Sequence, residues 1–114
     1  MNYTILNRDD LPFDGSTYEF IGAQYQNTDV SFILVDMPPG GNVRLHKHPY
    51  TEIFIIQEGT ATYIVRTETL EAHAGQIIIV LAETPHKFQN SGDQQLKQID
   101  IHVNKEFVTI WLED

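Results

Sequence analysis

Short runs of β-branched and aromatic residues, interrupted by turn-forming residues, constrain the fold of this chain most strongly. Turn signals such as Pro38-Pro39-Gly40-Gly41, Glu58-Gly59 and Asn90-Ser91-Gly92-Asp93 separate the runs. The runs predict strands over residues 17–25, 30–37, 42–48, 52–57, 60–66, 76–81, 86–90 and 95–103. Short strands at this spacing predict an all-β sandwich or barrel, not alternating βα units.

The size of the chain favours one domain over residues 1–114, because two cores rarely fit in 114 residues. The chain has no cysteine, which excludes disulfides and thiolate metal sites. One short helix is predicted at the C-terminus over residues 105–112. Asn104 would cap it, and Phe107, Ile110 and Trp111 would form its apolar stripe. We interpret Trp111 as a core or interface anchor.

The charge balance argues against anionic partners. Sixteen acidic and seven basic residues give a net charge of −9. Binding to nucleic acid requires clustered Lys and Arg, whereas the basic residues here are scattered. No basic segment followed by an apolar one begins the sequence, and the longest apolar run, residues 77–82, is too short to span a bilayer. We therefore expect no nucleic-acid partner, no membrane partner and a cytoplasmic location.

Histidines and a glutamate mark a candidate metal site. His46 and His48 lie two residues apart on a predicted strand, so their side chains face the same side. Glu52 opens the next strand after a break, and His86 lies on a later strand that a sandwich could bring alongside. Such a ligand set would suit zinc, manganese, iron, cobalt, nickel or copper. The alternative interpretation of an H-x-H pair is a surface or hydrogen-bonded pair without metal.

The glycines around these residues complete a known pattern. Gly40-x5-His46-x-His48-x3-Glu52-x6-Gly59 matches every fixed position of the first motif of the cupin superfamily, which it closely resembles. The second cupin motif is matched at Gly75, His86 and Asn90, whereas Leu81 replaces its proline and Glu83 its glycine. Both departures lie in the turn before His86, which Pro85 could stiffen in another way.

The resemblance implies a double-stranded β-helix, or jelly-roll barrel, with one divalent transition metal held by His46, His48, Glu52 and His86. Cupins include dioxygenases, isomerases and decarboxylases as well as proteins that only bind small molecules, so the fold does not choose among them. We expect a metal-dependent enzyme that oxygenates or isomerises a small oxygenated molecule. The alternatives are a non-catalytic binding or sensing protein and a metal-free acid–base site like that of sugar-nucleotide epimerases.

Strand parity predicts further residues of the cavity. Arg44 shares a predicted face with His46 and would bind a small carboxylate, while Phe54 and Phe88 would form the substrate-binding walls. Asn90 is expected to tie its turn rather than to contact substrate. Tyr50 could offer a hydroxyl at the cavity mouth, although exposed turn tyrosines are common. His73 precedes a strand at a turn and is expected to be exposed, outside the site.

The alternating segment at residues 98–103 leaves two orientations open. Its Ile/Val face is expected to point inward and its polar face outward; in the alternative, Gln98, Asp100 and His102 line the cavity. That alternative requires the outer face of the sheet to be buried in a dimer. A homodimer is also predicted because residues 52–57 and 76–81 are apolar at both parities, whereas a lone sandwich needs only one apolar face.

Overall fold

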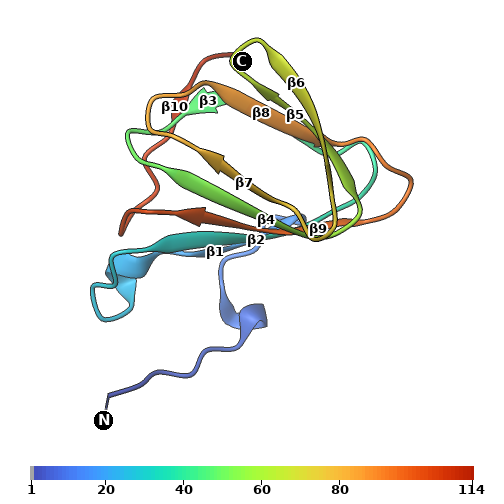
Figure 1. Cartoon of the computed structure of the whole chain (residues 1–114). Coiled ribbons are helices and arrows are strands. Elements are labelled where there is room, and N and C mark those ends of the chain that lie inside the picture. Colours follow the sequence, from blue (N-terminus) through green and yellow to red (C-terminus); the bar gives the residue numbers. More distant parts are fainter. Residues whose placement is uncertain (1) are drawn as a thin grey trace.

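The computed structural model describes residues 2–114, which form two antiparallel sheets facing each other (Figure 1). One sheet has the order β1-β2-β9-β4-β7 and the other the order β10-β3-β8-β5-β6. The strands are β1 (Thr17–Phe20), β2 (Ser31–Met37), β3 (Asn42–Lys47), β4 (Glu52–Glu58), β5 (Thr60–Val65), β6 (Glu68–His73), β7 (Ile77–Val80), β8 (His86–Asn90), β9 (Leu96–His102) and β10 (Ile110–Trp111). The predicted all-β jelly-roll architecture is confirmed.

Two short 3₁₀ turns, Arg8–Asp10 and Gly22–Gln24, flank β1. The predicted first strand ends early, because Gly22 begins the second of these turns. Residues 2–7 extend away from the barrel as a tail (Figure 1), whereas Leu11 is buried and Phe13 forms a β-bridge with Tyr18 of β1. None of the described residues forms a helix long and apolar enough to cross a membrane.

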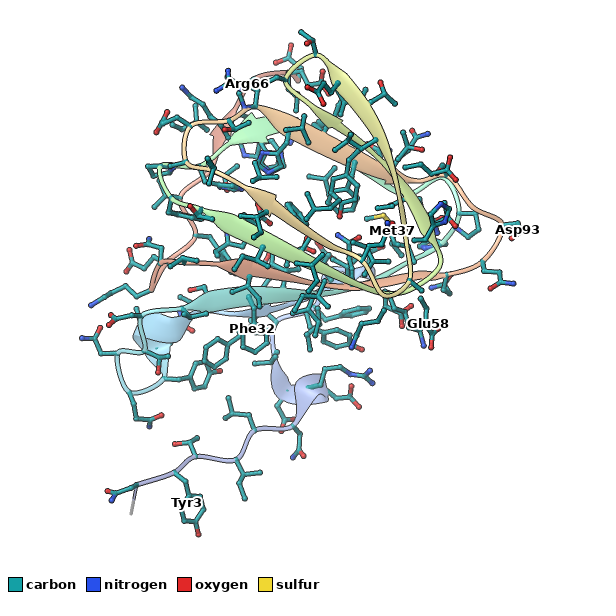
Figure 2. The ribbon with its side chains drawn as sticks, in the orientation of Figure 1. Tyr3, Phe32, Met37, Glu58, Arg66 and Asp93 are labelled. Carbon is teal, nitrogen blue, oxygen red and sulfur yellow. The ribbon has the colours of Figure 1, made fainter. Side chains whose placement is uncertain are left out.

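The apolar core lies between the sheets at the end of the barrel that holds Met37 (Figure 2). Its largest members, Phe54, Tyr63 and Phe88, pack ring against ring, with centroids 5.1 to 6.1 Å apart. Strand alternation produces this core, since every second residue of β4, β5 and β8 is buried. The same inward faces become polar toward the other end of the barrel, which defines the candidate site.

The predicted C-terminal helix is wrong. Residues 103–109 form a loop, and Ile110–Trp111 make the edge strand β10 against β3. The backbone N–H of Leu112 donates to the carbonyl of Leu45 at 2.9 Å. A helix of eight residues is too short to be stable without packing, and the unpaired edge of β3 supplies backbone partners that a helix could not use.

β6 was not predicted. Its sequence, residues 68–73, is mostly polar, and four of its residues in succession are exposed because it is an edge strand. Backbone pairing with β5, rather than an apolar pattern, holds it in place. His73 ends this strand and its side chain is exposed, as expected.

Candidate metal centre

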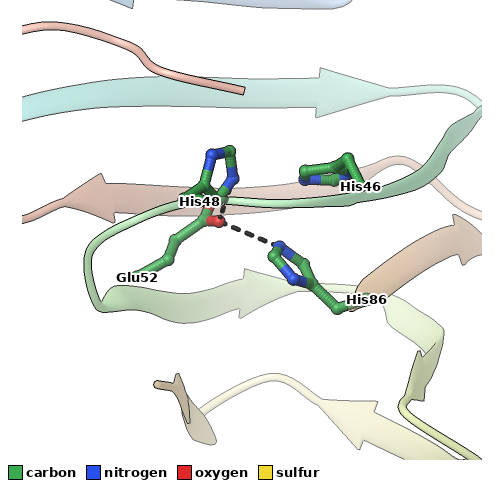
Figure 3. A group of neighbouring side chains, drawn as sticks. All are labelled: His46, His48, Glu52 and His86. Atoms are coloured by element: carbon green, nitrogen blue, oxygen red, sulfur yellow. Dashed lines mark hydrogen bonds and ion pairs between the residues drawn. The ribbon is translucent and has the colours of Figure 1, made fainter. Parts of the chain in front are cut away.

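Four buried side chains from three strands and the turn after β3 meet at the polar end of the barrel. They are His46, His48, Glu52 and His86, and their potential ligand atoms lie within 4.8 Å of one another. Glu52 Oε1 lies 3.0 Å from His48 Nε2 and 3.1 Å from His86 Nε2. Figure 3 shows the rings and the carboxylate directed toward one point. The structure therefore brings together all four predicted metal ligands.

Each of the three imidazoles is anchored through its other nitrogen. His46 Nδ1 lies 2.6 Å from the carbonyl of Arg44, His86 Nδ1 lies 2.9 Å from that of Thr84, and His48 Nδ1 lies 2.8 Å from that of Val108. A carbonyl oxygen only accepts hydrogen bonds, so each Nδ1 carries the hydrogen and donates. In the neutral rings Nε2 then carries the lone pair, which in His48 and His86 faces Oε1 of Glu52.

These lone pairs and a carboxylate are an arrangement that a cation would stabilise. His48 Nε2 is fully enclosed, yet it has no hydrogen bond of acceptable geometry among the described residues. Burial lowers the pKa of His46 to about 4, so that ring is neutral at physiological pH. Metal-binding histidines in proteins commonly donate their second nitrogen to a backbone carbonyl in this way. The four residues thus fit a divalent metal.

Glu52 is ionised despite its burial. Burial alone would raise its pKa, but the close contact of its Oε2 with the His102 imidazole holds that pKa well below the usual range. His102 Nε2 lies 3.1 Å from Oε2, the second carboxylate oxygen. On its other side, His102 Nδ1 lies 2.6 Å from the Tyr50 hydroxyl. His102 therefore packs against the second oxygen of Glu52, but its Nε2, like that of His48, makes no hydrogen bond of acceptable geometry within residues 2–114.

Tyr50 connects this support to the C-terminal loop. Burial raises the pKa of Tyr50 to about 12, so its hydroxyl stays protonated and can donate to His102 Nδ1. The same oxygen accepts the backbone N–H of Val108 at 3.2 Å. The expectation that the polar face of β9 points outward is therefore wrong, since Gln98, Asp100 and His102 are all buried inside the barrel.

Arg44 does not share the inward face of His46. Val43 pairs with Phe88 and His46 pairs with His86, so three residue steps in β3 match two in β8. This β-bulge inserts one extra residue and reverses the parity on which the prediction for Arg44 depends. Arg44 is exposed, with its guanidinium carbon 4.5 Å from the centre of the Trp111 ring. Val43, instead of Arg44, lines the cavity.

The two predicted aromatic walls have different positions. Phe88 lines the cavity beside the ligands, whereas Phe54 lies in the core, where its ring meets that of His86 edge-on at 5.8 Å. Asn90 ties its turn as expected, since its Nδ2 donates to the carbonyls of Met37 and Gln94.

A cavity of about 310 Å³ opens beside His46, His48 and Glu52. This volume suits a small molecule, at the lower end of the usual range of about 300–1,000 Å³. Trp111 lines the cavity, with its ring centre 5.2 Å from that of His46. It therefore belongs to the wall of the cavity and not to the core. Phe107 and Thr109 also lie along the wall, which places the C-terminal loop over the barrel end.

Apart from its histidines, the ionisable side chains known to line the cavity are acidic. Besides Glu52 and Asp100, the lining includes Asp14 and Glu19, and no Lys or Arg of residues 2–114 contributes to it. Partial burial opposes ionisation of Asp14, but the backbone N–H groups of Ser16 and Thr17 donate to its Oδ1 and lower its pKa. The carboxylate-binding role predicted for Arg44 therefore has no basic side chain to perform it among the described residues that line the cavity.

Comparison with known families agrees with this geometry. The sequence profile of the cupin domain matches residues 33–102, which include all four candidate ligands. The chain belongs to the cupin family. This cupin is 36% identical over 75 residues to an uncharacterized protein of Methanocaldococcus jannaschii and 31% identical over 67 residues to the polyketide synthase CurC of Streptomyces cyaneus. These matches cover 64% and 58% of the chain but only 59% and 44% of the two relatives.

Solved structures resemble this cupin in fold. Bacillus subtilis oxalate decarboxylase, studied for its Mn(II) centers, superposes with a TM-score of 0.80 at 22% identity, over 91% of this chain and 30% of that one. A structure of oxalate oxidase superposes with a TM-score of 0.72 at 19% identity, over 85% of this chain and 54% of that one. At these identities the likeness establishes the jelly-roll fold alone.

The turn before His86 accommodates Glu83 at the position where the second cupin motif has glycine. Glu83, which replaces the motif glycine, has a φ of +65° in the left-handed region that favours glycine. Its backbone N–H donates to the carbonyl of His48 at 2.7 Å, and its carboxylate pairs with Lys47 at 3.0 Å. These contacts hold the conformation without glycine, so His86 still reaches the centre.

Proposed function

We propose that this cupin binds one divalent transition metal ion through His46, His48, Glu52 and His86. The observation that carries the proposal is the common orientation of the three imidazoles. Each donates Nδ1–H to a backbone carbonyl, which leaves the Nε2 lone pair free for a metal. Nε2 of His48 and Nε2 of His86 both lie beside Oε1 of Glu52, and the ligand atoms of all four residues are within 4.8 Å of one another. Three nitrogens and one oxygen suit zinc, manganese, iron, cobalt, nickel or copper. The Mn(II) centers of oxalate decarboxylase make manganese one metal to test.

The cavity supports a role in chemistry on a small oxygenated molecule. A bound metal would polarise an oxygen of such a molecule and favour its oxygenation or isomerisation. Phe88 and Val43 would hold its carbon atoms, and Trp111 would cover one side. Glu52 is committed to the centre, so it does not serve as a free base.

The charges around the cavity narrow the ligand class. A divalent ion and the Glu52 carboxylate would give a net charge of +1, while Asp14 and Glu19 add negative charge near the opening. No basic side chain of the described residues lines the cavity to compensate a second ligand charge. We therefore propose a ligand with at most one negative charge, such as a hydroxy acid or an α-hydroxycarbonyl compound.

Metal content tests the proposal directly. Protein purified without an affinity tag should contain about one divalent metal per chain by mass spectrometry. His46→Ala, His48→Ala, Glu52→Ala and His86→Ala should each lower metal affinity on the order of a hundredfold or more, because each removes one of four ligands. His73→Ala is the matched control, since His73 is exposed on β6. Unchanged metal content in the four variants would contradict the proposal.

Turnover needs a separate measurement. Oxygen consumption and proton NMR of hydroxy acids and hydroxycarbonyl compounds, with the metal-loaded protein, would detect oxygenation or isomerisation. Saturable ligand binding without turnover would support the alternative of a non-catalytic binding or sensing cupin. We retain the cytoplasmic location as a prediction.

A further inference from the structure

A second carboxyl group is buried in the same cavity as the metal centre. Asp100 lies in the middle of β9, where it pairs with Phe54 of β4 on one side and Ile33 of β2 on the other. Its side chain is only 3% exposed, yet it lines the cavity together with Glu52 and His102. The proposed metal centre does not use it. An acidic side chain at such a depth normally has a partner or a function.

A chain of hydrogen bonds fixes the orientation of Asp100. The Tyr63 hydroxyl donates to Gln98 Oε1 at 2.9 Å, and Gln98 Nε2 donates to Asp100 Oδ1 at 2.7 Å. The reverse amide orientation would leave the fully buried Tyr63 hydroxyl without an acceptor among the described residues. Asp100 Oδ1 is therefore the accepting oxygen of the carboxyl group.

The second oxygen, Oδ2, faces the cavity. Oδ2 makes no hydrogen bond within residues 2–114, and it is not fully enclosed by protein atoms. It therefore retains contact with the open space of the cavity, where a ligand would lie.

The surroundings of Asp100 favour its neutral form. Gln98 supplies a single amide hydrogen, and no cationic side chain of residues 2–114 contacts the carboxyl group. Its titratable neighbours are the ionised Glu52 and the Tyr63 hydroxyl. A buried carboxylate without a cation or several donors is costly, because desolvation disfavours the charge. Burial accordingly raises the pKa of Asp100 well above its usual range, and in the metal-free protein the charge of Glu52 adds to this effect. With Oδ1 accepting from Gln98, the acid hydrogen is on Oδ2.

We propose that Asp100 is a ligand-binding acid, whose Oδ2–H donates a hydrogen bond to an anionic oxygen of the small molecule in the cavity. The inference rests on the proposed function, because it places that molecule beside the metal centre. It also deepens that function, since a ligand would need one oxygen for the metal and another for Asp100. A singly charged hydroxy acid offers both oxygens. A hydrogen bond from the neutral acid to a charged oxygen is also stronger than one to a neutral oxygen.

Binding of glycolate to the cobalt-loaded protein tests the donor role, with isothermal titration calorimetry as the readout. Asp100→Asn keeps the shape, accepts from Gln98 and still presents N–H groups to the cavity, so the dissociation constant should change by less than about threefold. Asp100→Leu removes the donor and should weaken glycolate binding by about tenfold to a hundredfold. Cobalt affinity should be unchanged in both variants, because Asp100 is not a proposed ligand.

Tyr63→Phe is the structural control. It loosens the hydrogen-bond chain but leaves the Asp100 donor in the cavity, so its effect should be smaller than that of Asp100→Leu. An equal effect in both variants would show that the loss is structural and would overturn the proposal. Tighter glycolate binding by Asp100→Asn and Asp100→Leu would identify an ionised, repelling carboxylate, and unchanged binding in both would show that Asp100 does not contact the ligand. Either result overturns the proposal.

Infrared spectroscopy tests the inference without any metal. The chelator-treated protein at neutral pH should show the C=O stretching band of a protonated carboxylic acid, and this band should disappear in Asp100→Asn. Absence of the band would overturn the inference even if metal and glycolate bind. If the band is present but the protein binds no metal, the neutral form of Asp100 is established and the proposed metal centre is rejected. The two failures are therefore distinguishable.

Discussion

The residues of the candidate centre are oriented by carbonyl groups from near and remote parts of the chain. His46 and His86 each donate to the residue two positions earlier, at Arg44 and Thr84. His48 instead donates to Val108, sixty residues later. The anchors of His46 and His86 are therefore local in sequence, whereas the anchor of His48 requires the docked C-terminal loop.

The low pKa of His46 predicts a pH dependence of stability in the metal-free protein. The folded pKa is about 4 and the reference value is 6.5, so the unfolded chain binds the proton first as pH falls. The stability that the neutral ring contributes is present above pH 6.5 and is lost as pH falls from about 6.5 to 4. After allowance for partial solvent access, the loss should be about 1–3 kcal/mol.

Urea unfolding of chelator-treated protein between pH 7 and pH 4 would measure this loss. His46→Asn is the comparison, because its amide cannot titrate but can still donate to the Arg44 carbonyl. The free energy of unfolding should fall more steeply in the wild type than in the variant. Glu52 has a lowered pKa in the folded protein, so its contribution to stability is lost only as pH falls below its reference pKa of 4.5. That contribution is the same in both proteins. Parallel curves would contradict the assignment to His46.

At the scale of single residues, the ligands could be predicted from the sequence but their support could not. The types and spacing of His46, His48, Glu52 and His86 are enough to indicate metal binding. Tyr50, His102 and Asp100 give a weaker signal, because a tyrosine in a turn and an alternating strand each fit two orientations. Only the pairing of β9 between β2 and β4 settles which face of that strand is inside.

Among the elements, β3 shows where parity arguments fail. The bulge between Val43 and His46 changes which side of the strand faces inward, and a sequence pattern does not mark the extra residue. His46 and His48 lie at and after the bulge, and their side chains share the inward face as predicted, because their spacing of two lies outside it. Arg44 lies inside the irregular stretch and was predicted wrongly.

The C-terminal segment was the least predictable element, because its spacing of apolar residues fits a helix while its backbone pairs with a remote strand. Phe107 and Trp111 were expected on one helical stripe; both line the cavity, but from a loop and an edge strand. Local periodicity carries no information about the unpaired edge of β3. That edge lies beside the C-terminal segment only in the folded barrel.

The docked loop predicts a role for this segment in metal affinity. Removing residues 108–114 deletes the carbonyl that anchors His48 and the N–H that binds Tyr50. Metal affinity should fall by about tenfold to a hundredfold, the usual effect of losing a hydrogen-bond partner of a ligand. Removing only residues 112–114 is the control, since both Val108 contacts remain. Competition with a chromophoric chelator would measure the affinities; equal values for the two truncated proteins would contradict this role.

For the molecule as a whole, the outer face of the sheet containing β4 and β7 is unusually apolar. Ile77 and Ile79 on the edge strand β7 are 63% and 62% exposed, and they pair with Ile55 and Ile53 of β4. Farther along the same sheet, Phe32, which is labelled in Figure 2, stacks on Phe20, and Phe20 in turn stacks on Tyr25. An exposed apolar sheet face of this kind favours association with another protein surface.

The homodimer remains a prediction, now located on this face. Light scattering at micromolar concentration should give twice the mass of one chain. Ile79→Lys should shift the mass to that of the monomer, because a twofold interface would bury two like charges near each other. Ile5→Lys, in the exposed N-terminal tail, is the control and should leave the dimer intact. A wild-type monomer would refute the prediction.

The position of Trp111 gives the molecule a built-in optical probe. It is the only tryptophan of the chain, and its ring lies between the guanidinium of Arg44, 4.5 Å away, and the ring of His46, 5.2 Å away. All indole fluorescence of this protein therefore originates at the wall of the candidate centre. Changes in its intensity or emission wavelength on adding an ion or a small molecule would report events at that wall, without any attached dye.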